Sequence, residues 1–508
     1  MSRPAARSSS SSAFRFRRAA FCSSWDAFNR MLAAFARNFA AFARSFSSFC
    51  SSGLAAGSAI GAGTGPLTKA FRRPAFPSVV KVYVEAYGCT QNYGEARLMQ
   101  QAITSRGHAI APTPGEADAN VLVTCTVIET TERKMLRRME ALAADGKPLV
   151  VAGCMAAAQR DLVRRTVPAA KLVPPRKWPQ IVELLGAGTV CGERALDAES
   201  EQYAWRDAIV PIAQGCAARC TYCITRIARG RVMSYPIDDL VARIRGYVEA
   251  GIREIKLTGQ DTAAYGMDVG QTLADLIEAV TRIDGDFRVR VGMMDPLTAL
   301  PILPDLVRAY DSPKVYKFLH LPVQSGDDSI LEAMKREYGV ADFERIVAEF
   351  RAAVPEISIS TDIIVGFPGE TEDAFERSFD LVRRVRPETV NITRFSPRAG
   401  TPAATMPDPV VGWRVKERSR RLTRLRMAIS REIHETLVGR EIPILTTEPG
   451  KGGTTLARTD AYRQVVLPSE EAVGEFRVAR ILAGRESDLI GELITNPVSY
   501  ERGREMDA

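Results

Sequence analysis

Apolar runs alternate with amphipathic stretches along the chain from residue 79 onward. The first three runs predict buried strands at 79–88, 119–125 and 148–154. Between them, apolar positions recur at helical spacing and predict helices at 95–107 and 129–146. An alternation of strands and helices predicts a parallel sheet, because parallel neighbours need a crossover connection between them.

The same alternation continues over six further units, and these predict a partial or open TIM-like (β/α)6 barrel. Its strands are expected in the runs at 208–215, 254–262, 287–296, 317–326, 357–370 and 389–400. A site at the carboxyl ends of those strands is expected in this architecture. From residue 441 onward, short alternating strands broken by Gly and Pro predict a small β-barrel instead.

The chain of 508 residues is long enough for several domains, and the patterns divide it into four regions. The predicted regions are a low-complexity extension at 1–78, an α/β domain at 79–190, the barrel domain at 205–435 and the small β-barrel at 436–500. A stretch at about 171–208, rich in Gly, Pro and acids, predicts a linker between the two larger domains.

Ser, Ala, Phe and Arg dominate the first 75 or so residues. An Arg-rich, Ser-rich and acid-poor composition is typical of an organellar transit peptide. The alternatives are a disordered tail, or upstream sequence translated from a start codon assigned too early. No apolar run reaches 18 residues, so no transmembrane helix is expected. A cytoplasmic enzyme is predicted, organellar only if the extension is a transit peptide.

The net charge of +8 is concentrated in the same extension. The first 80 residues hold eleven Lys or Arg and a single acid, Asp26, so the remainder is close to neutral. The overall charge therefore indicates nothing about partners, and only local basic runs are informative.

Single cysteines follow each of the first three predicted strands: Cys89, Cys125 and Cys154. Because ligands gather beyond the carboxyl ends of parallel strands, these three thiols are expected to converge at one edge of the sheet. A buried free cysteine is ordinarily just a small hydrophobic residue, but three at equivalent strand ends favour a shared role. Zinc would need a fourth ligand, and His108 lies away from a strand end. Three convergent thiolates suit an iron–sulfur cluster with one iron open.

Three more cysteines stand close together in "CAARCTYC", at positions 216, 220 and 223. The segment follows a predicted strand and reads as a loop, which allows the backbone to wrap a cluster. A cubane has four irons, so three thiolates leave the fourth iron free to hold a chelating substrate.

The C-x3-C-x2-C spacing with Tyr222 before the third cysteine resembles the signature of radical S-adenosylmethionine enzymes. The upstream "YGCTQN", "TCTV" and "AGCM" are similar to the methylthiotransferases of that superfamily, and the resemblance covers about 79–497. It implies two [4Fe-4S] clusters, one on Cys216, Cys220 and Cys223 and one on the strand-end trio. It also implies S-adenosylmethionine as both radical source and methyl donor, with the second cluster presenting sulfur.

Positional arguments extend the resemblance to cofactor-binding residues. Tyr222 resembles the aromatic residue that lies against the adenine. Polar groups at the predicted strand ends are expected to face S-adenosylmethionine or substrate: Gly259, Gln260, Asp261, Gln324, Ser325, Asp362 and Arg394. Asp261 serves equally well as a helix cap. Arg394 is expected to pair with a substrate or cofactor carboxylate, or else to close the barrel by a salt bridge.

A basic helical stretch and the small β-barrel indicate an RNA substrate. Eight Lys or Arg stand between Arg414 and Arg431 against one acid, Glu417, although such a run is ordinarily a solvated face. The small barrel resembles the RNA-binding TRAM domain. The predicted RNA contacts are Arg420, Arg421, Arg424, Arg458, Tyr462 and Arg463. A single-stranded loop is the expected target, because its bases can be splayed into a cleft.

The subgroup is indicated by "YGCTQNYGEA", "TGQDTAAYG", "CITRIARGR" and "DIIVGFPGE". These resemble the archaeal and eukaryotic branch that methylthiolates N6-threonylcarbamoyladenosine at position 37 of the tRNA anticodon loop. The lack of an apolar anchor after residue 497 favours an archaeal-type enzyme. The protein is expected to be a monomer that does not associate with a membrane. An electron donor and a sulfur source, both unidentified, are expected as partners. The alternatives are a methylthiotransferase for isopentenyladenosine or for a ribosomal-protein aspartate, or a non-enzymatic RNA-binding protein with structural clusters or zinc.

Overall fold

The computed structural model describes residues 79–185 and 207–494. The predictions of a transit peptide and of a missing carboxyl-terminal anchor concern residues outside these ranges. Within them, no helix combines the length and apolar content needed to cross a membrane.

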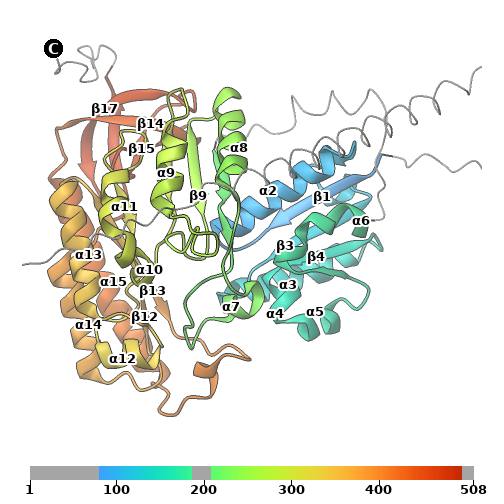
Figure 1. Cartoon of the computed structure of the whole chain (residues 1–508), viewed down its shortest axis with the longest axis horizontal. Coiled ribbons are helices and arrows are strands. Elements are labelled where there is room, and N and C mark those ends of the chain that lie inside the picture. The colour runs from blue at the N-terminus through green and yellow to red at the C-terminus, as the bar shows by residue number, and fades with distance from the viewer. Residues whose placement is uncertain (1–78, 186–206, 495–508) are drawn as a thin grey trace, which may run out of the picture. The chain divides into compact units, whose positions relative to one another are not determined.

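The first domain is a five-stranded parallel sheet in the order β2-β1-β3-β4-β5 (Figure 1). Its strands are β1 (Lys81–Ala86), β2 (Ala109–Ile110), β3 (Ala119–Thr124), β4 (Leu149–Gly153) and β5 (Lys171–Val173). Its helices are α2 (Thr90–Thr104), α3 (Glu129–Ala143), α4 (Cys154–Ala158), α5 (Arg160–Thr166) and α6 (Ile181–Leu184). The predicted α/β fold with a parallel sheet is confirmed.

The central strand β3 is buried at every position, which explains why its sequence is apolar apart from Asn120 and Thr124. Val121 and Val123 face one hydrophobic core, and Leu122 faces a second core on the other side of the sheet. The predicted linker begins too early in the chain, because β5, a 3-10 helix at Pro175–Gln180 and α6 complete this domain. Trp178 and Val182 pack against the first of the two cores, so this segment belongs to the domain.

The second domain contains six parallel strands in two three-stranded sheets, β6-β9-β10 and β11-β12-β13. The strands are β6 (Ala208–Pro211), β9 (Glu254–Thr258), β10 (Arg288–Val291), β11 (Phe318–His320), β12 (Ser358–Val365) and β13 (Thr389–Arg394). A parallel bridge between Val289 and Val315 joins the sheets, so the six strands form the partial barrel predicted from the sequence.

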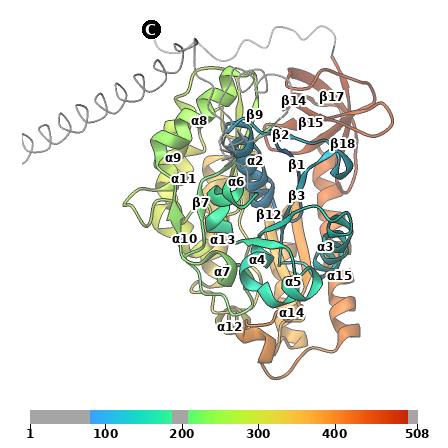
Figure 2. The ribbon, with the colours of Figure 1, turned by 90° about the vertical axis from the view of Figure 1, so that its right-hand side faces the viewer.

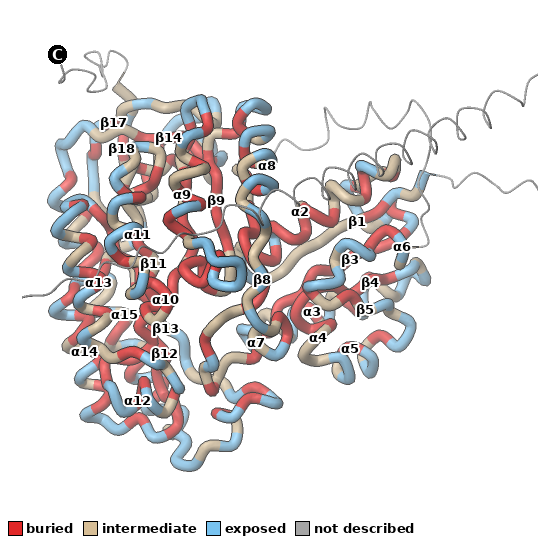
Figure 3. Tube along the Cα trace, viewed as in Figure 1, coloured by how far each residue is buried: buried red, intermediate tan, exposed pale blue. Residues whose placement is uncertain are grey.

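Helices cover the outer face of this barrel (Figures 1 and 2). They include α8 (Ile237–Glu249), α9 (Leu273–Thr281), α10 (Pro296–Ala299), α11 (Leu303–Ala309), α13 (Val340–Ala353) and α14 (Glu372–Val385). Alternate strand residues such as Ile255 and Leu257 pack beneath them in one large core. Buried and exposed positions alternate along α8 and α13, as expected for helices with one face on a sheet (Figure 3).

The carboxyl-terminal region consists of α15 (Gly412–Glu435) and a closed five-stranded barrel. The barrel strands are β14 (Glu441–Pro449), β15 (Thr455–Thr459), β16 (Gln464–Leu467), β17 (Phe476–Gly484) and β18 (Leu489–Leu493). Helix α15 packs alongside β13 and reaches β17 at its end, as Figure 2 shows.

The turn between β15 and β16 contacts the amino-terminal ends of the larger barrel's strands. Asp460 forms an ion pair with Arg288 at 2.9 Å, and its carbonyl accepts from the Lys317 amide at 2.7 Å. Ser358 Oγ donates to the Ala461 carbonyl at 2.6 Å. The small barrel therefore seals the end of the partial barrel opposite to the expected site.

Candidate active site

The three single cysteines lie at neighbouring strand ends, as the sequence predicts. Cys89 precedes the first turn of α2, Cys125 follows β3, and Cys154 begins α4 directly after β4. Because β1, β3 and β4 are parallel neighbours, all three residues fall at one edge of the sheet.

Two polar side chains tie the three cysteine turns together. Asn92 Nδ2 donates to the carbonyls of Tyr87 at 2.8 Å and Thr124 at 3.0 Å, which links the Cys89 turn to the end of β3. Thr124 Oγ1 donates to the Ala152 carbonyl at 2.6 Å and accepts from the Met155 amide at 3.2 Å. Asn92 was not among the predicted site residues, although its position three residues after Cys89 is a readable signal.

Gly88 allows the first two cysteine turns to approach closely. Its φ of 112° lies in the region that favours glycine, and a Cβ added there would lie 2.5 Å from Cys125 Cβ and 2.9 Å from Cys125 Sγ. The glycine in "YGC" is therefore required by the packing of the two cysteine turns.

Burial controls the ionisation of these thiols in the protein alone. Desolvation raises the pKa of Cys154 to about 12 and also raises the pKa of Cys89, while the charge of Arg229 lowers both. Cys89 has exposed surface as a residue, yet its thiol lies deep enough for burial to dominate. Thiolates at this site require a strong positive partner, which a metal cluster provides.

The second cysteine set occupies the loop between β7 (Ala213–Gln214) and α7 (Ile224–Arg229). The Cys216 amide donates to the Gly230 carbonyl at 3.2 Å, and the Gly215 amide donates to Gln260 Oε1 at 2.8 Å. A Cβ at Gly215 would lie 2.0 Å from the Arg231 carbonyl oxygen, so only glycine fits before Cys216. Gln260 thus holds the cysteine loop from the end of β9.

A buried arginine contacts this loop. Arg336 Nη1 donates to Cys220 Sγ at 3.2 Å and lies 2.8 Å from Asp295 Oδ2. Burial is the main cause that raises the pKa of Cys216 and Cys220, and Arg336 opposes it at Cys220. Nothing in the local sequence around Arg336 marks it, because its position beside Cys220 arises from the packing of the barrel.

Asp261 lies next to the loop and is only 2% exposed. It accepts hydrogen bonds from the Asp295 amide at 3.0 Å and from Thr298 Oγ1 at 2.8 Å. Desolvation and the nearby Asp295 carboxylate raise the pKa of Asp261 to about 7. The helix-cap alternative does not apply, since the residue that caps α10 is Asp295, whose side chain accepts from the Leu297 amide.

Tyr222 packs in an apolar cluster with Met334 and Phe367, its ring edge-on to Phe367 at a centroid distance of 6.4 Å. A Cβ added at Gly259 would not clash with the surrounding protein, because the nearest atoms would lie 3.6 Å from it or farther. Contact of Tyr222 or Gly259 with S-adenosylmethionine stays a prediction.

Asp362 lies within β12 and not at its end, contrary to the sequence prediction, because the strand continues to Val365. Its carboxylate accepts from Asn391 Nδ2 at 2.7 Å and lies 3.1 Å from His320 Nε2. Gln324 has a φ of 71°, and its amide donates to the Asp362 carbonyl at 2.8 Å. Asp362 therefore forms a polar cluster with His320 of β11 and Asn391 of β13, neither of which was predicted, whereas Gln324 reaches it only through the backbone.

Ser325, another residue of the predicted strand-end group, is buried. Its hydroxyl accepts from the Asp327 amide at 3.2 Å, just before α12 (Asp328–Ala333). This contact is a local turn contact.

Arg394, the last residue of β13, is exposed and forms no salt bridge with another described residue, so the barrel-closing alternative is not realised. Arg398 makes the inter-domain contact instead. It pairs with Glu132 at 2.9 Å and donates to the Val127 carbonyl at 2.9 Å, two residues after Cys125. Arg398 is not among the site residues predicted from the sequence.

The two cysteine sets meet through α7, whose last residue is Arg229. Arg229 Nη2 donates to Asn92 Oδ1 at 2.7 Å and to Glu95 Oε2 at 3.0 Å, and Nη1 donates to Gln214 Oε1 at 2.8 Å. Helix α7 begins directly after Cys223 and packs against α4, which begins with Cys154. The structure therefore brings the two predicted cluster sites to one junction between the domains.

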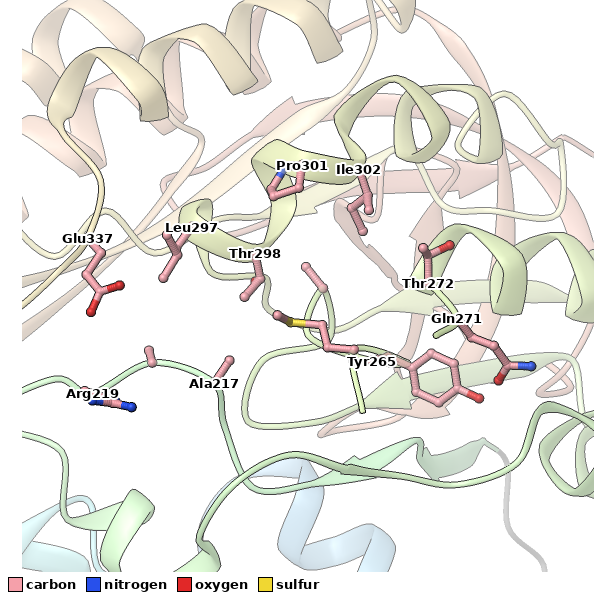
Figure 4. Close-up of a pocket in the computed structure, with 13 residues that line it drawn as sticks. Ala217, Arg219, Tyr265, Gln271, Thr272, Leu297, Thr298, Pro301, Ile302 and Glu337 are labelled. Atoms are coloured by element: carbon pink, nitrogen blue, oxygen red, sulfur yellow. The ribbon is translucent and has the colours of Figure 1, made fainter. Parts of the chain in front are cut away.

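Two cavities flank this junction. One of about 610 Å³ lies beside the cysteine loop, with Ala217 and Arg219 on one side and Leu297, Thr298 and Pro301 on the other (Figure 4). A second of about 580 Å³ lies between the first domain and the loop after β13, lined by Glu129, Glu132, Arg160, Ser396 and Arg398. Among the described residues, no three His, Cys, Asp or Glu side chains converge on a point suitable for one metal ion.

The predicted RNA contacts on α15 divide into two groups. Arg420 and Arg424 are exposed on the helix. Arg421 is used internally, because it pairs with Glu372 at 3.1 Å and Glu376 at 2.7 Å on α14. Of the three predicted RNA contacts on α15, only Arg420 and Arg424 are therefore exposed for phosphate contact.

Three predicted RNA contacts in the small barrel lie at its interface with the large one. The Tyr462 ring packs 4.8 Å from Tyr316 and 5.1 Å from Phe318, with Arg458 over it at 4.7 Å. Arg463 forms a two-pronged ion pair with Glu388. These contacts engage Arg458, Tyr462 and Arg463 within the protein, and RNA binding by these residues stays a prediction.

Comparisons with known proteins agree with the three regions. The chain matches the models of the Radical SAM superfamily over residues 210–382, of uncharacterized protein family UPF0004 over 81–174 and of the TRAM domain over 435–494. A solved radical S-adenosylmethionine methyltransferase from Kitasatospora setae is similar at a TM-score of 0.45 and 13% identity, over 64% of this chain and 77% of that one.

Curated relatives match over nearly the whole described chain. The chain is 42% identical to a probable threonylcarbamoyladenosine tRNA methylthiotransferase of Pyrococcus horikoshii, over 82% of this chain and 100% of that protein. It is 43% identical to a protein of the same name from Archaeoglobus fulgidus, over 82% and 99%. A human threonylcarbamoyladenosine tRNA methylthiotransferase is 35% identical, over 78% and 71%. The chain therefore belongs to the threonylcarbamoyladenosine tRNA methylthiotransferase family.

Proposed function

We propose that the protein converts N6-threonylcarbamoyladenosine at position 37 of tRNA to its 2-methylthio derivative. The observation that carries this proposal is the meeting of two cysteine triads, from two domains, at the junction formed by α7 and Arg229. A methylthiolation needs one centre that activates a C–H bond and another that delivers sulfur, and the two must act on one substrate atom. Family membership supports the same activity and the same nucleoside.

The residues of the cysteine loop fit a [4Fe-4S] cluster that binds S-adenosylmethionine. Cys216, Cys220 and Cys223 supply three sulfur ligands, which leave one iron for the cofactor. When bound, this pair supplies a carbon radical able to remove hydrogen from an unactivated carbon. The chain's part is to hold the loop, through Gln260 at the Gly215 amide and Arg336 at Cys220 Sγ.

The strand-end triad fits a second cluster, which would present the transferred sulfur. Cys89, Cys125 and Cys154 are neighbours at one sheet edge, and Asn92 and Thr124 set their mutual positions. Cys125 and Cys154 are buried, whereas Cys89 is exposed. S-adenosylmethionine would also provide the methyl group, and the Arg398–Glu132 contact keeps the two domains together around the substrate.

We assign fewer residues to cofactor and RNA contacts than were predicted from the sequence. Tyr222, Gly259 and Arg394 stay candidate contacts to S-adenosylmethionine or substrate, whereas Gln260 acts by holding the cysteine loop. For tRNA, exposed Arg420 and Arg424 on α15 offer phosphate contacts. An external electron donor and a sulfur source remain part of the proposal.

The test is single-turnover reaction of anaerobically reconstituted protein with tRNA that carries threonylcarbamoyladenosine. The proposal predicts about eight irons per chain for two cubanes and the 2-methylthio nucleoside by mass spectrometry. Bound zinc without sulfide would instead establish the non-enzymatic alternative. Product only on isopentenyladenosine tRNA, or only on a ribosomal protein, would reassign the substrate.

A further inference from the structure

The environment of Arg229 differs from that of an ordinary inter-domain arginine. Its side chain is 1% exposed, and its ion-pair partner Glu95 is 0% exposed. Gln214 Nε2 donates to Glu95 Oε1 at 2.7 Å, so the pair is enclosed by polar groups from both domains. A buried ion pair of this kind is costly in solvation and adds little net stability by itself. Net stability therefore does not explain why the Arg229–Glu95 ion pair is buried at this junction.

Two observations connect Arg229 to the strand-end triad. The carboxyl end of α7, which carries Arg229, lies against α4, which starts at Cys154, and Asn92 links Arg229 to the Cys89 and Cys125 turns. A buried guanidinium, which stays positively charged, therefore lies beside the turns that carry the triad.

One nitrogen of the Arg229 guanidinium, Nε, differs from the other two in its hydrogen bonding. Both terminal nitrogens of Arg229 bond to Glu95, Asn92 or Gln214, whereas Nε is buried and has no hydrogen-bond partner among the described residues. A buried N–H without an acceptor is uncommon in folded proteins and marks a group for a ligand or strain. Gln91 Oε1, on the same helix as Glu95, is likewise buried without a donor.

We propose that Arg229 is a positioning and charge-compensating residue for the cluster held by Cys89, Cys125 and Cys154, and that it raises that cluster's reduction potential. The inference rests on the proposed function, because it requires a cluster at this triad. Three thiolates would give the cluster negative charge at a site where Cys125 and Cys154 are buried. Net charge and hydrogen bonds to sulfur set cluster potentials. Glu95 orients the guanidinium and limits the size of the effect.

The test measures the potential of the second cluster alone. Full-length protein with Cys216→Ala, Cys220→Ala and Cys223→Ala is reconstituted anaerobically, and its cluster is titrated by spectroelectrochemistry with detection by electron paramagnetic resonance. In this background, Arg229→Gln should lower the midpoint potential, Glu95→Gln should raise it, and Arg229→Lys should leave it close to the parent value. Arg336→Gln, which removes the buried arginine of the other triad, should cause no shift.

Opposite shifts separate an electrostatic role from a purely structural clamp, which would move both variants in the same direction or neither. Unchanged potentials in loaded Arg229→Gln and Glu95→Gln would overturn the inference. If Arg229→Gln does not fold, Glu95→Gln and Arg229→Lys decide the question. A parent that holds no iron or sulfide at the strand-end triad would refute the second cluster of the proposed function, an outcome distinct from a loaded cluster whose potential does not respond.

Discussion

The two cysteine triads are assembled by opposite structural routes. Cys216, Cys220 and Cys223 stand within eight residues on one loop, so the sequence spacing alone brings them together. The other triad depends on the register of three parallel strands, on Asn92, which joins the ends of β1 and β3, and on Thr124, which joins β3 to the end of β4. The contiguous triad is thus specified locally, whereas the scattered triad exists only once the first domain has folded.

Each triad also has a buried arginine nearby. The two arginines differ in whether they come from the same domain as the cysteines or from the neighbouring domain. Arg336 comes from the same domain as Cys220 and contacts its sulfur directly. Arg229 comes from the neighbouring domain and reaches the scattered triad through Asn92. We therefore expect the scattered triad to be the more sensitive of the two to changes at the domain junction.

The largest expected effect separates the two triads by function. Cys220→Ala should reduce reductive cleavage of S-adenosylmethionine to the background level, because the first cluster loses a ligand, while tRNA affinity stays unchanged within about twofold. The measurement is release of 5′-deoxyadenosine together with tRNA binding. Normal release in this variant would refute the assignment of the contiguous triad.

The complementary variant should break the other half of the comparison. Cys125→Ala should retain cleavage of S-adenosylmethionine but yield no methylthio product, because the sulfur-presenting site is lost. Quantifying 5′-deoxyadenosine and the modified nucleoside in the same reaction gives both results. Full product formation would show that Cys125 takes no part in sulfur transfer.

A glycine variant tests whether packing alone defines the scattered triad. Gly88→Ala places a methyl group 2.5 Å from Cys125 Cβ at a φ of 112°, so cluster loading at this triad should fall several-fold. Iron and sulfide content, measured in the background without the loop cysteines, reports the loss. Gly246→Ala in α8 is the matched control, since nothing lies within 4 Å of its Cβ. Equal loading in both variants would contradict the packing argument.

The smallest expected effects concern RNA binding by α15, away from both triads. Arg420→Ala should weaken tRNA binding and reduce the magnitude of its salt slope by about 0.7 to 1, as loss of one phosphate contact would. Arg421→Ala should leave that slope unchanged but lower the free energy of unfolding by about 1 kcal/mol, since it breaks ion pairs to α14. Identical salt slopes for Arg420→Ala and the parent would remove α15 from the RNA interface.

The sequence predicted the three folded regions and both cysteine sets, because hydrophobic period and strand-end position are local properties. It placed Asp362 at a strand end because a polar residue inside a buried run looks like a boundary, and the His320 and Asn391 contacts that accommodate it are long-range. The roles of Arg336 and Arg398 could not be predicted from the sequence for the same reason. The same holds for the pairing of Arg229 with Glu95. Tyr462 looked like a base-stacking residue because its aromatic partners, Tyr316 and Phe318, lie more than a hundred residues away.

That last contact also shows why deletion of the small barrel is a poor test of RNA binding. Its removal would uncover Tyr316 and Phe318 and break the Asp460–Arg288 and Arg463–Glu388 pairs. A loss of tRNA affinity after deletion would then mix destabilisation with lost contacts. Single arginine variants avoid this problem.

The cooperation of the two triads is tested most directly by nucleoside mass spectrometry after a single turnover on tRNA that carries threonylcarbamoyladenosine. The parent protein, Cys220→Ala and Cys125→Ala are compared under identical anaerobic conditions. The account predicts the 2-methylthio nucleoside with the parent and unmodified threonylcarbamoyladenosine with either variant. The methylthio product from either variant, or its absence with a parent that holds both clusters and cleaves S-adenosylmethionine, would contradict it.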